Sequence, residues 1–359
     1  MRDQAPVLIL DGGLGTTLEE KYHIRFSSAE TPLWSSHLLL SDQRTVLSCH
    51  EDFAEAGADI ISTATYQTSI DGFANTRTPD WPNGVPLNRI PECIEDAVMI
   101  ARSAHPTEGV ALSLGPYGAT TIPSQEYGGE YDADHSGVDA LMAWHLERIS
   151  VFTKAPGMFG GVKYVAFETV PRLDEIVAIR QVIDAWEGLR GMPCWISCVF
   201  PGEDDALRLP DGTTVEEAVR AMLSPEVAGV APWGIGINCT KVTKLPALVE
   251  RYEAAVKDMV RTGELTGWPS LVLYPDGTNG EVYNTTTQKW EMPEGMEAPK
   301  VSWESQVVEV VKATQSRGLW NTIVVGGCCK ATPEDIGRLR EALIPDKATV
   351  NSSLDGKRL

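Results

Sequence analysis

The chain alternates short apolar, β-branched runs with amphipathic helical patterns, and this alternation constrains the fold more than any other feature. Eight runs, each ending in turn residues or a polar group, are predicted as strands: Val7–Leu10, Ala58–Thr65, Gly109–Leu114, Tyr164–Phe167, Cys194–Phe200, Gly234–Ile237, Leu271–Tyr274 and Thr322–Val325. Helical patterns lie between them at Val46–Glu55, Glu92–Ser103, Ala140–Phe152, Asp174–Trp186, Thr214–Leu223, Leu245–Val260, Trp303–Ser316 and Pro333–Leu343. Continuous apolar strands that alternate with helices predict a parallel sheet covered on both faces.

Eight such units in 359 residues favour an α/β fold of the TIM type, a (β/α)8 barrel, over a doubly wound sheet, which usually has fewer strands. No linker divides the chain, so we expect a single domain over residues 1–350 and a polar tail over residues 351–359. Thr76–Pro91, Gly115–Tyr131 and Asp276–Pro299 are too long for ordinary connections and are predicted to be functional loops or disordered insertions.

The charge balance excludes several kinds of partner. Asp and Glu number 50 against 30 Lys and Arg, for a net charge of −20, which repels the phosphate backbone of nucleic acids. No apolar run approaches the roughly 20 residues that cross a bilayer, and Pro6–Leu10 is too short for a secretory signal. We therefore expect a cytoplasmic protein with no membrane or nucleic-acid partner, either a monomer or a small homo-oligomer.

Candidate site residues follow from where the predicted strands end. In a (β/α)8 barrel the catalytic groups lie at the C-terminal ends of the strands, around one mouth. Polar residues stand at or just after five of these ends: Asp11, Tyr66, Glu168, Asn238 with Cys239, and Cys328 with Cys329. The barrel would bring these thiols and carboxylates together, although they are far apart in sequence.

The three strand-end cysteines are candidate ligands for one metal ion. Cys239, Cys328 and Cys329 would supply three thiolates, a ligand set that selects Zn²⁺, and would leave the fourth position open for catalysis. Neighbouring residues of a strand point to opposite faces, so both Cys328 and Cys329 reach one metal only if Gly326–Gly327 turns the chain out of the strand. On spacing alone, two buried thiols beside a turn or a redox pair remain alternatives.

The segments at Asp11 and Glu168 are candidate sites for a carboxylate and for an ammonium group, and each also has a structural interpretation. Asp11 precedes Gly12–Gly13, whose N–H groups either form a tight turn or bind an anion. No Lys or Arg lies between Val7 and Glu20, which favours a carboxylate over a phosphate. Glu168 ends an apolar run, so it either lies exposed at the rim or faces a cation such as an ammonium group.

The other cysteines and the histidines are predicted to have structural roles. Cys49, Cys93, Cys194 and Cys198 lie in apolar or helical surroundings and are expected to be small buried side chains. No histidine ends a predicted strand, so surface or helix-packing positions are expected for all of them: His23, His37, His50, His105, His135 and His145. The sequence therefore offers no visible Ser-His-Asp triad.

Several blocks of this sequence closely resemble the homocysteine S-methyltransferase family, zinc-dependent barrels that bind homocysteine. They occur in the family's order over nearly the whole chain: DGGLGTTLE at 11–19, TATYQTS at 63–69, GPYGA at 115–119, FETVPRLDE at 167–175, GINCT at 236–240, YPDG at 274–277 and VVGGCCKATPEDI at 324–336. GINC followed much later by GGCC is the most specific of these signatures. The resemblance implies a (β/α)8 barrel, in agreement with the strand count.

The resemblance also implies roles for individual residues. Cys239, Cys328 and Cys329 match the family's zinc ligands, and Asp11 and Glu168 match the acids that bind the homocysteine ammonium. The segment after Asp11, with Gly12 and Gly13, matches the one that receives the carboxylate. Tyr66 matches the tyrosine after the second strand, which in some relatives approaches the open zinc site when substrate is absent, and Tyr66 and Asn238 are both expected to contact the substrate. The implied reaction moves a methyl group to the zinc-bound thiolate of L-homocysteine and forms methionine.

The methyl donor is expected to be a small molecule, because 359 residues leave no room for cobalamin and folate domains. The segment GPYGATTIPSQEYGGEYD resembles the S-methylmethionine branch of the family, which favours a sulfonium donor, S-methylmethionine or S-adenosylmethionine. Trp34, Tyr117, Tyr127 and Phe200 are candidates for lining the donor site. The alternatives are a betaine-homocysteine methyltransferase and a non-catalytic zinc or thiol redox sensor on the same barrel.

Overall fold

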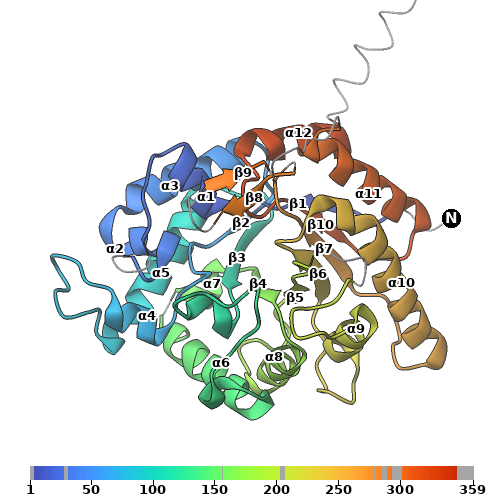
Figure 1. The fold of residues 1–359 in the computed structure, drawn as a ribbon, viewed down its shortest axis with the longest axis horizontal. Coiled ribbons are helices and arrows are strands. Elements are labelled where there is room, and N and C mark those ends of the chain that lie inside the picture. The colour runs from blue at the N-terminus through green and yellow to red at the C-terminus, as the bar shows by residue number, and fades with distance from the viewer. Residues whose placement is uncertain are drawn as a thin grey trace, which may run out of the picture.

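A computed structural model describes residues 4–27, 31–155, 157–202, 207–278, 280–284, 289–292 and 301–345. Its main sheet has 8 parallel strands in the order β1-β10-β7-β6-β5-β4-β3-β2. The strands are β1 (Val7–Ile9), β2 (Ile60–Ser62), β3 (Gly109–Leu114), β4 (Tyr164–Val170), β5 (Cys194–Cys198), β6 (Gly234–Asn238), β7 (Ser270–Tyr274) and β10 (Ile323–Val325). Figure 1 shows these strands gathered at the centre with the helices around them.

The sheet closes where β1 meets β2. Leu10 and Ile60 form a parallel bridge, and the Asp59 amide donates to the Ile9 carbonyl at 2.7 Å. The Asp11 amide adds a bond to the Ile60 carbonyl at 3.1 Å. With this seam the eight strands form a (β/α)8 barrel of the TIM type, which confirms the fold predicted from the sequence.

Helices follow the strands and cover the outside of the barrel. The longer ones are α1 (Leu14–Glu20), α3 (Gln43–Glu55), α5 (Ile90–Ser103), α6 (Val138–Phe152), α8 (Leu173–Ala185), α9 (Val215–Leu223), α10 (Leu245–Thr262), α11 (Trp303–Arg317) and α12 (Pro333–Leu343). Short helices are α2 (Leu38–Ser41), α4 (Ile70–Asn75) and α7 (Met158–Gly161), and 3-10 turns lie at Trp34–His37, Leu87–Arg89, Tyr117–Thr120, Ala133–His135 and Val242–Lys244. None of the helices in the described part of the chain is long and apolar enough to cross a membrane.

Local sequence explains several helix ends. Thr214 and Thr332 each form a capping box with an acid three residues later, so α9 and α12 begin where the first-turn N–H groups gain side-chain acceptors. Gly263 and Gly318 end α10 and α11 in the left-handed region, at φ 83° and 62°, where a side chain would be strained.

The barrel has two apolar layers. The larger lies between the strands and the helices, and the smaller fills the barrel itself around Trp195, which is fully buried. The Trp195 indole N–H donates to the Tyr274 hydroxyl at 3.1 Å, so the interior is a packed core with polar groups toward one end. Ligands must therefore bind at the mouth above this core.

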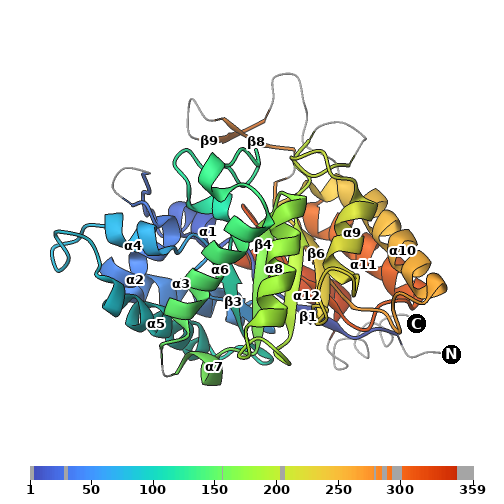
Figure 2. The same cartoon turned by 90° about the horizontal axis from the view of Figure 1, so that it is seen from below.

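One predicted loop contains regular structure. The segment Asp276–Pro299 was expected to lack it, but a two-stranded antiparallel hairpin lies within it, formed by β8 (Val282–Asn284) and β9 (Lys289–Glu291). Each strand has only 3 residues, too few for an alternating pattern to stand out in the sequence. Figure 2 places this hairpin beyond one end of the barrel, on the side opposite α7.

Other expected boundaries shifted by a few residues. Thr76–Pro91 was predicted as a loop, but α5 already begins at Ile90 because Pro91 is favourable in the first turn of a helix. The second strand ends at Ser62 rather than at Thr65. The chain then enters a turn, in which the hydroxyls of Thr63 and Thr65 are hydrogen-bonded to each other at 2.6 Å. The predicted polar tail at 351–359 lies outside the described residues.

Candidate metal and substrate site

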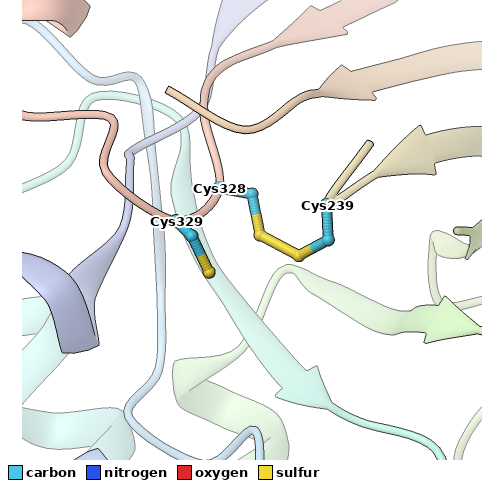
Figure 3. Close-up of side chains that lie close together, drawn as sticks. All are labelled: Cys239, Cys328 and Cys329. Carbon is cyan, nitrogen blue, oxygen red and sulfur yellow. A yellow bond between two sulfur atoms is a disulfide. The ribbon is translucent and has the colours of Figure 1, made fainter. Parts of the chain in front are cut away.

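The three strand-end cysteines meet at the C-terminal mouth of the barrel. Cys239 follows β6, and Cys328 and Cys329 follow β10. Their sulfur atoms all lie within 4.8 Å of one another. In Figure 3 a disulfide joins Cys239 to Cys328, and the Cys329 side chain points toward this pair. The structure thus brings together the residues predicted as metal ligands.

The glycines before the second cysteine segment have the expected role. β10 ends at Val325, and Gly326–Gly327 leads the chain away from the strand before Cys328. A Cβ on Gly326 would lie 2.5 Å from the Asp11 carbonyl oxygen, and one on Gly327 would lie 2.1 Å from the Ala331 Cβ. Only glycine fits between these neighbours, so the turn that lets adjacent cysteines reach one point depends on both residues.

The end of β7 links the two cysteine segments through backbone hydrogen bonds. The Cys239 amide donates to the Tyr274 carbonyl at 3.2 Å, and the Cys328 amide donates to the Pro275 carbonyl at 2.8 Å. Gly277 then donates to the Cys329 carbonyl at 2.7 Å. The YPDG motif at 274–277 therefore fixes the spacing of the thiols, a role that the sequence alone did not indicate.

Asn238 and Thr169 orient the Cys239 thiol. The Asn238 amide group donates to Cys239 Sγ at 3.3 Å and to Thr169 Oγ1 at 2.7 Å, while its carbonyl oxygen accepts from the Thr169 amide at 2.8 Å. Thr169 and Cys239 both have positive φ, 59° and 46°, an uncommon conformation for residues other than glycine. The Asn238 side chain, predicted to contact substrate, is thus committed to neighbouring protein groups, and its substrate contact stays a prediction.

Asp11 and Glu168 are buried carboxyl groups near the thiols. Asp11 Oδ2 accepts from the Ser62 amide at 2.7 Å and Oδ1 accepts from the Ser62 hydroxyl at 3.0 Å. Glu168 accepts a short hydrogen bond from the Ser113 hydroxyl. Neither carboxyl belongs to an ion pair among the described residues. Of the two alternatives for Glu168, an exposed position at the rim is excluded, because the residue is only 9% exposed.

Burial controls the protonation of these acids. Burial raises the pKa of Asp11 to about 7, although the Ser62 hydrogen bonds lower it, and the charge of Glu168 raises it further. Burial likewise raises the pKa of Glu168 to about 7, against hydrogen bonds from Ser113 and Tyr274. Two carboxyl groups that share a buried space without a cation are suited to receive a positively charged ligand.

Gly12 and Gly13 pack directly on the cysteine loop. A Cβ on Gly12 would lie 2.4 Å from the Ala331 carbonyl oxygen, and one on Gly13 would lie 2.5 Å from the Cys328 carbonyl oxygen. The Gly13 amide donates to the Ala331 carbonyl at 2.9 Å, so this N–H is already engaged. Close packing explains both glycines, and binding of a substrate carboxylate by them stays a prediction.

Tyr66 lies at the site, as predicted from its position after the second strand. Its carbonyl accepts from the Gly115 amide at 3.0 Å, and its hydroxyl bonds to Thr169. Burial, followed by the charge of Glu126, raises the pKa of Tyr66 well above its ordinary value, and Glu168 and Cys329 also act on it. Tyr66 is therefore a neutral hydroxyl in a position where the charges of the buried acids and of Cys329 act on it.

The structure adds three residues that sequence reasoning did not place at the thiols. Tyr127, one of the four aromatic candidates, lies close enough to the Cys329 thiol to lower its pKa, and the charges of Asp276 and Glu126 both act on that thiol. Asp276 belongs to YPDG and Glu126 to the segment after β3, so their motifs were visible but their convergence was not. Tyr117 and Phe200 pack elsewhere, against Tyr131 and Tyr252.

The donor set fits a thiophilic metal ion. Burial, followed by the charge of Asp276, raises the pKa of the Cys329 thiol to about 12, so a thiolate is stable there only beside a cation. Three converging sulfurs are the donor set that zinc prefers. Two of these sulfurs are joined in the Cys239–Cys328 disulfide, so the disulfide must be reduced before all three can bind a metal.

Comparisons with known proteins agree with this site. The family model for homocysteine S-methyltransferase matches residues 8–343. A selenocysteine Se-methyltransferase of Brassica oleracea var. italica is 28% identical over 371 residues, which covers 98% of this chain and 93% of that protein. A homocysteine S-methyltransferase of Escherichia coli (strain K12) is 28% identical over 342 residues, covering 94% and 96%.

Solved structures resemble the whole barrel. The crystal structure of the homocysteine methyltransferase MmuM from Escherichia coli in its oxidized form has a TM-score of 0.64 and 27% identity, covering 93% of this chain and 95% of that one. The metallated form has a TM-score of 0.61 at 23% identity, covers 94% and 96%, and supports the fold alone. With a family model that spans nearly all of the barrel, this chain belongs to the homocysteine S-methyltransferase family.

Proposed function

We propose that this enzyme transfers a methyl group from a sulfonium donor, S-methylmethionine or S-adenosylmethionine, to the sulfur of L-homocysteine, forming methionine. The observation that carries the proposal is the convergence of three thiols within 4.8 Å beside two buried carboxyl groups that have no cationic partner among the described residues. A thiol-binding metal centre next to an ammonium-binding pocket is suited to an amino acid that bears a thiol. The name of the Escherichia coli relative agrees with this acceptor, and the Brassica relative is named for selenocysteine, an amino acid with the same kind of nucleophile.

Cys239, Cys328 and Cys329 would hold one zinc ion once the disulfide is reduced. A zinc ion bound there would lower the pKa of a substrate thiol, which is near ~8.5 in water, and so supply a thiolate nucleophile at neutral pH. Asn238 and Thr169 keep the Cys239 sulfur in place through their hydrogen bonds. The three cysteines therefore act as ligands, and the chemistry occurs at the sulfur of the substrate.

Asp11 and Glu168 would bind the ammonium group of homocysteine. An arriving ammonium favours the ionised form of both carboxyl groups, whose pKa values burial raises to about 7 in the free protein. Ser62 and Ser113 hold these carboxyl groups in position through hydrogen bonds. Fixing the ammonium at the strand ends aims the thiol of the substrate at the cysteine cluster, which reduces the entropy cost of the reaction.

The methyl transfer itself needs little from the protein besides positioning. The carbon–sulfur bond of the sulfonium breaks with its electron pair left on the donor, which becomes a neutral thioether. The homocysteine sulfur forms the new bond to the methyl carbon, and its proton has already been released to solvent. Tyr66 and Tyr127 lie near the Cys329 thiol and would border the bound substrates.

The test is methionine formation by protein that has been reduced with a phosphine and loaded with zinc. S-methylmethionine, S-adenosylmethionine and betaine are offered in separate reactions with homocysteine, and selenocysteine is offered as a second acceptor. We expect turnover with a sulfonium. Turnover with betaine alone would refute the proposal of a sulfonium donor. Turnover with none of the three donors would refute the proposed reaction and favour the redox-sensor alternative.

The matched variants separate the metal site from the fold. Cys239→Ser should lose tight zinc binding and reduce turnover by ~10³-fold or more, the equivalent of about 4 kcal/mol of transition-state stabilisation. Cys93→Ser, which changes a half-buried cysteine on α5, should keep both zinc and activity. A metal-free Cys239→Ser protein with full activity would refute the metal centre.

A further inference from the structure

Glu126 is a buried acid that the reaction described above does not use. It lies in the segment after β3, between the 3-10 turns at Tyr117–Thr120 and Ala133–His135, and is 7% exposed. Its Oε2 atom has no hydrogen-bond partner among the residues that the structure describes. Leaving a buried carboxylate oxygen unpaired is costly, so the position makes chemical sense only if another group completes it.

The neighbours of Glu126 locate it over the thiols. Its charge acts on the Cys329 thiol and on the hydroxyls of Tyr66 and Tyr127. Asp11 and Glu168 are electrostatically coupled to each other, whereas Glu126 is not among the groups that act on either of them. The charges of both Glu126 and Glu168 act on Tyr66, so Tyr66 lies near both acids. Glu126 is thus an acid near the cysteines in addition to the coupled pair Asp11 and Glu168.

Asp276 is the other acid beside Cys329, and it differs from Glu126 in its charge environment. Lys241 and Lys244 act on Asp276 and offset its negative charge. Within the described part of the chain, the groups that act on Glu126 are Ser124 and its own backbone, with no cation among them. Of the two acids near the thiols, Glu126 is therefore the one that lacks a counter-charge.

We propose that Glu126 is the counter-charge for the cationic methyl donor, which binds with its positive centre between the Glu126 carboxylate and the ring of Tyr127. The inference deepens the proposed function and rests on it for the nature of the ligand. Sulfonium and quaternary ammonium groups share the required chemistry, a diffuse positive charge without N–H donors. An aromatic face and an unpaired carboxylate recognise such a group.

Tyr127 is placed to complete this subsite. It lies close enough to the Cys329 thiol to lower the pKa of that thiol, and 43% of its surface is exposed, so the residue is near the cysteines and also borders solvent at the mouth. A donor entering from solvent meets this ring before it meets the cysteines. Homocysteine, anchored by Asp11 and Glu168 at the strand ends, then receives the methyl group from the mouth side.

The charge change during the reaction predicts which kinetic constant depends on Glu126. The donor is cationic when it binds and neutral after methyl transfer, so the carboxylate stabilises the bound ground state at least as strongly as the transition state. Removing the charge should therefore raise the KM for the donor and leave kcat unchanged or higher. A residue with a purely structural role would not produce this separation.

The experiment compares Glu126→Gln with Glu130→Gln, a matched change at an exposed acid of the same segment. With reduced, zinc-loaded enzyme at saturating homocysteine, we expect the KM for S-methylmethionine to rise by tenfold or more in Glu126→Gln. The KM for homocysteine, the zinc content and the melting temperature should stay unchanged. Glu130→Gln should match the wild type, and Glu126→Asp should restore part of the donor affinity.

A neutral isostere separates charge from shape. In 2-amino-5-methylhexanoate a CH group replaces the sulfonium sulfur of S-methylmethionine. The wild type should bind S-methylmethionine more tightly than this compound in calorimetry, and Glu126→Gln should lose most of that preference. Equal loss of affinity for both compounds, or an unchanged donor KM, would overturn the proposal.

The same measurements distinguish failure of this inference from failure of the proposed function. A wild-type enzyme that forms no methionine with any donor refutes the proposed reaction. The calorimetric preference for the cationic compound over its neutral isostere would then still decide whether Glu126 forms a cation subsite. Turnover without dependence on Glu126 refutes the subsite alone.

Discussion

Glu168 and Glu175 are buried acids on adjoining elements, one on β4 and the other on α8, and they have opposite surroundings. Glu175 is 0% exposed and surrounded by partners, whereas Glu168 has hydroxyl donors but no cation among the described residues. The comparison shows that burial of a charge does not by itself mark a functional residue. What marks it is a buried charge that the protein leaves without an opposite charge.

The network around Glu175 holds two distant segments together. Its Oε1 accepts from the Tyr117 amide at 2.7 Å and bonds to His145 Nε2 at 3.0 Å, while Oε2 accepts from the Tyr131 hydroxyl at 2.5 Å. Arg148 contacts His145 and donates to the Gly115 carbonyl at 3.0 Å. Hydrogen bonds from Tyr117 and Tyr131 to Glu175 thus anchor both ends of the segment that carries Glu126.

Glu168 has the reverse arrangement. Ser113 donates a hydrogen bond to it, and the nearby Tyr274 hydroxyl also favours its ionised form, yet burial still raises its pKa to about 7. Glu168 is therefore a buried carboxyl group whose ionised form has no cation to stabilise it among the described residues. The following predictions test this difference, from the largest expected effect to the smallest.

Replacing Glu175 should cost the most stability. Glu175→Ala leaves Arg148 as a buried charge without its carboxylate and should lower the free energy of unfolding by about 3–5 kcal/mol. Urea titration with circular dichroism detection measures this change, and Glu175→Gln, which keeps the acceptor oxygen, should lose less. A Glu175→Ala protein as stable as the wild type would show that this cluster is not structural.

The raised pKa values of the site acids predict a pH effect of the opposite sign to ordinary acid denaturation. Because the folded pKa of Glu168 is about 7 against 4.5 in the unfolded chain, the native state retains a proton that the unfolded state has lost. Below about pH 4.5 Glu168 is protonated in both states and costs no stability. As the pH rises toward 7, the unfolded state loses this proton more readily, so the free energy of unfolding falls.

Metal-free wild type should therefore lose stability relative to Glu168→Gln between pH 5 and 8, by an amount on the order of 3 kcal/mol. The measurement is the difference in free energy of unfolding between the two proteins at each pH. A difference that does not vary with pH, or that grows in the other direction, would contradict the raised pKa of Glu168.

Glu168→Gln should weaken homocysteine binding without weakening the fold. Loss of one charged hydrogen-bond partner of the ammonium predicts a loss of ~1.5–3 kcal/mol, or roughly 10- to 100-fold in affinity. Isothermal calorimetry with the zinc-loaded protein measures it, and the melting temperature at pH 8 should stay equal to that of the wild type or rise. Unchanged homocysteine affinity would remove the role proposed for Glu168.

The smallest effect is expected at an acid that is exposed and paired. Glu20 forms an ion pair with Lys330, next to the cysteine loop, and 46% of its side chain is exposed. Glu20→Gln should change the free energy of unfolding by less than about 1 kcal/mol and leave turnover within twofold. A larger loss would mean that this pair positions the cysteine loop.

Local sequence patterns predicted the strands and the large helices well, because the periodicity of apolar residues depends on near neighbours. Gly109–Leu114 was predicted with the observed bounds, and so was Pro333–Leu343. The hairpin of β8 and β9 was missed, since strands of 3 residues carry too little pattern. The sequence predicted a surface or helix-packing position for His145, but it did not predict the partner of His145, Glu175 on α8.

The sequence also determined which side chains reach the mouth, because a barrel places every strand end on one face. Cys239, Cys328 and Cys329 could be identified from that rule together with the family resemblance. Only the tertiary structure decided the environment of each acid: that Glu175 meets His145, that lysines act on Asp276, and that no cation among the described residues acts on Glu126. Pairing of charges depends on contacts between residues far apart in the chain, and no local pattern records those contacts.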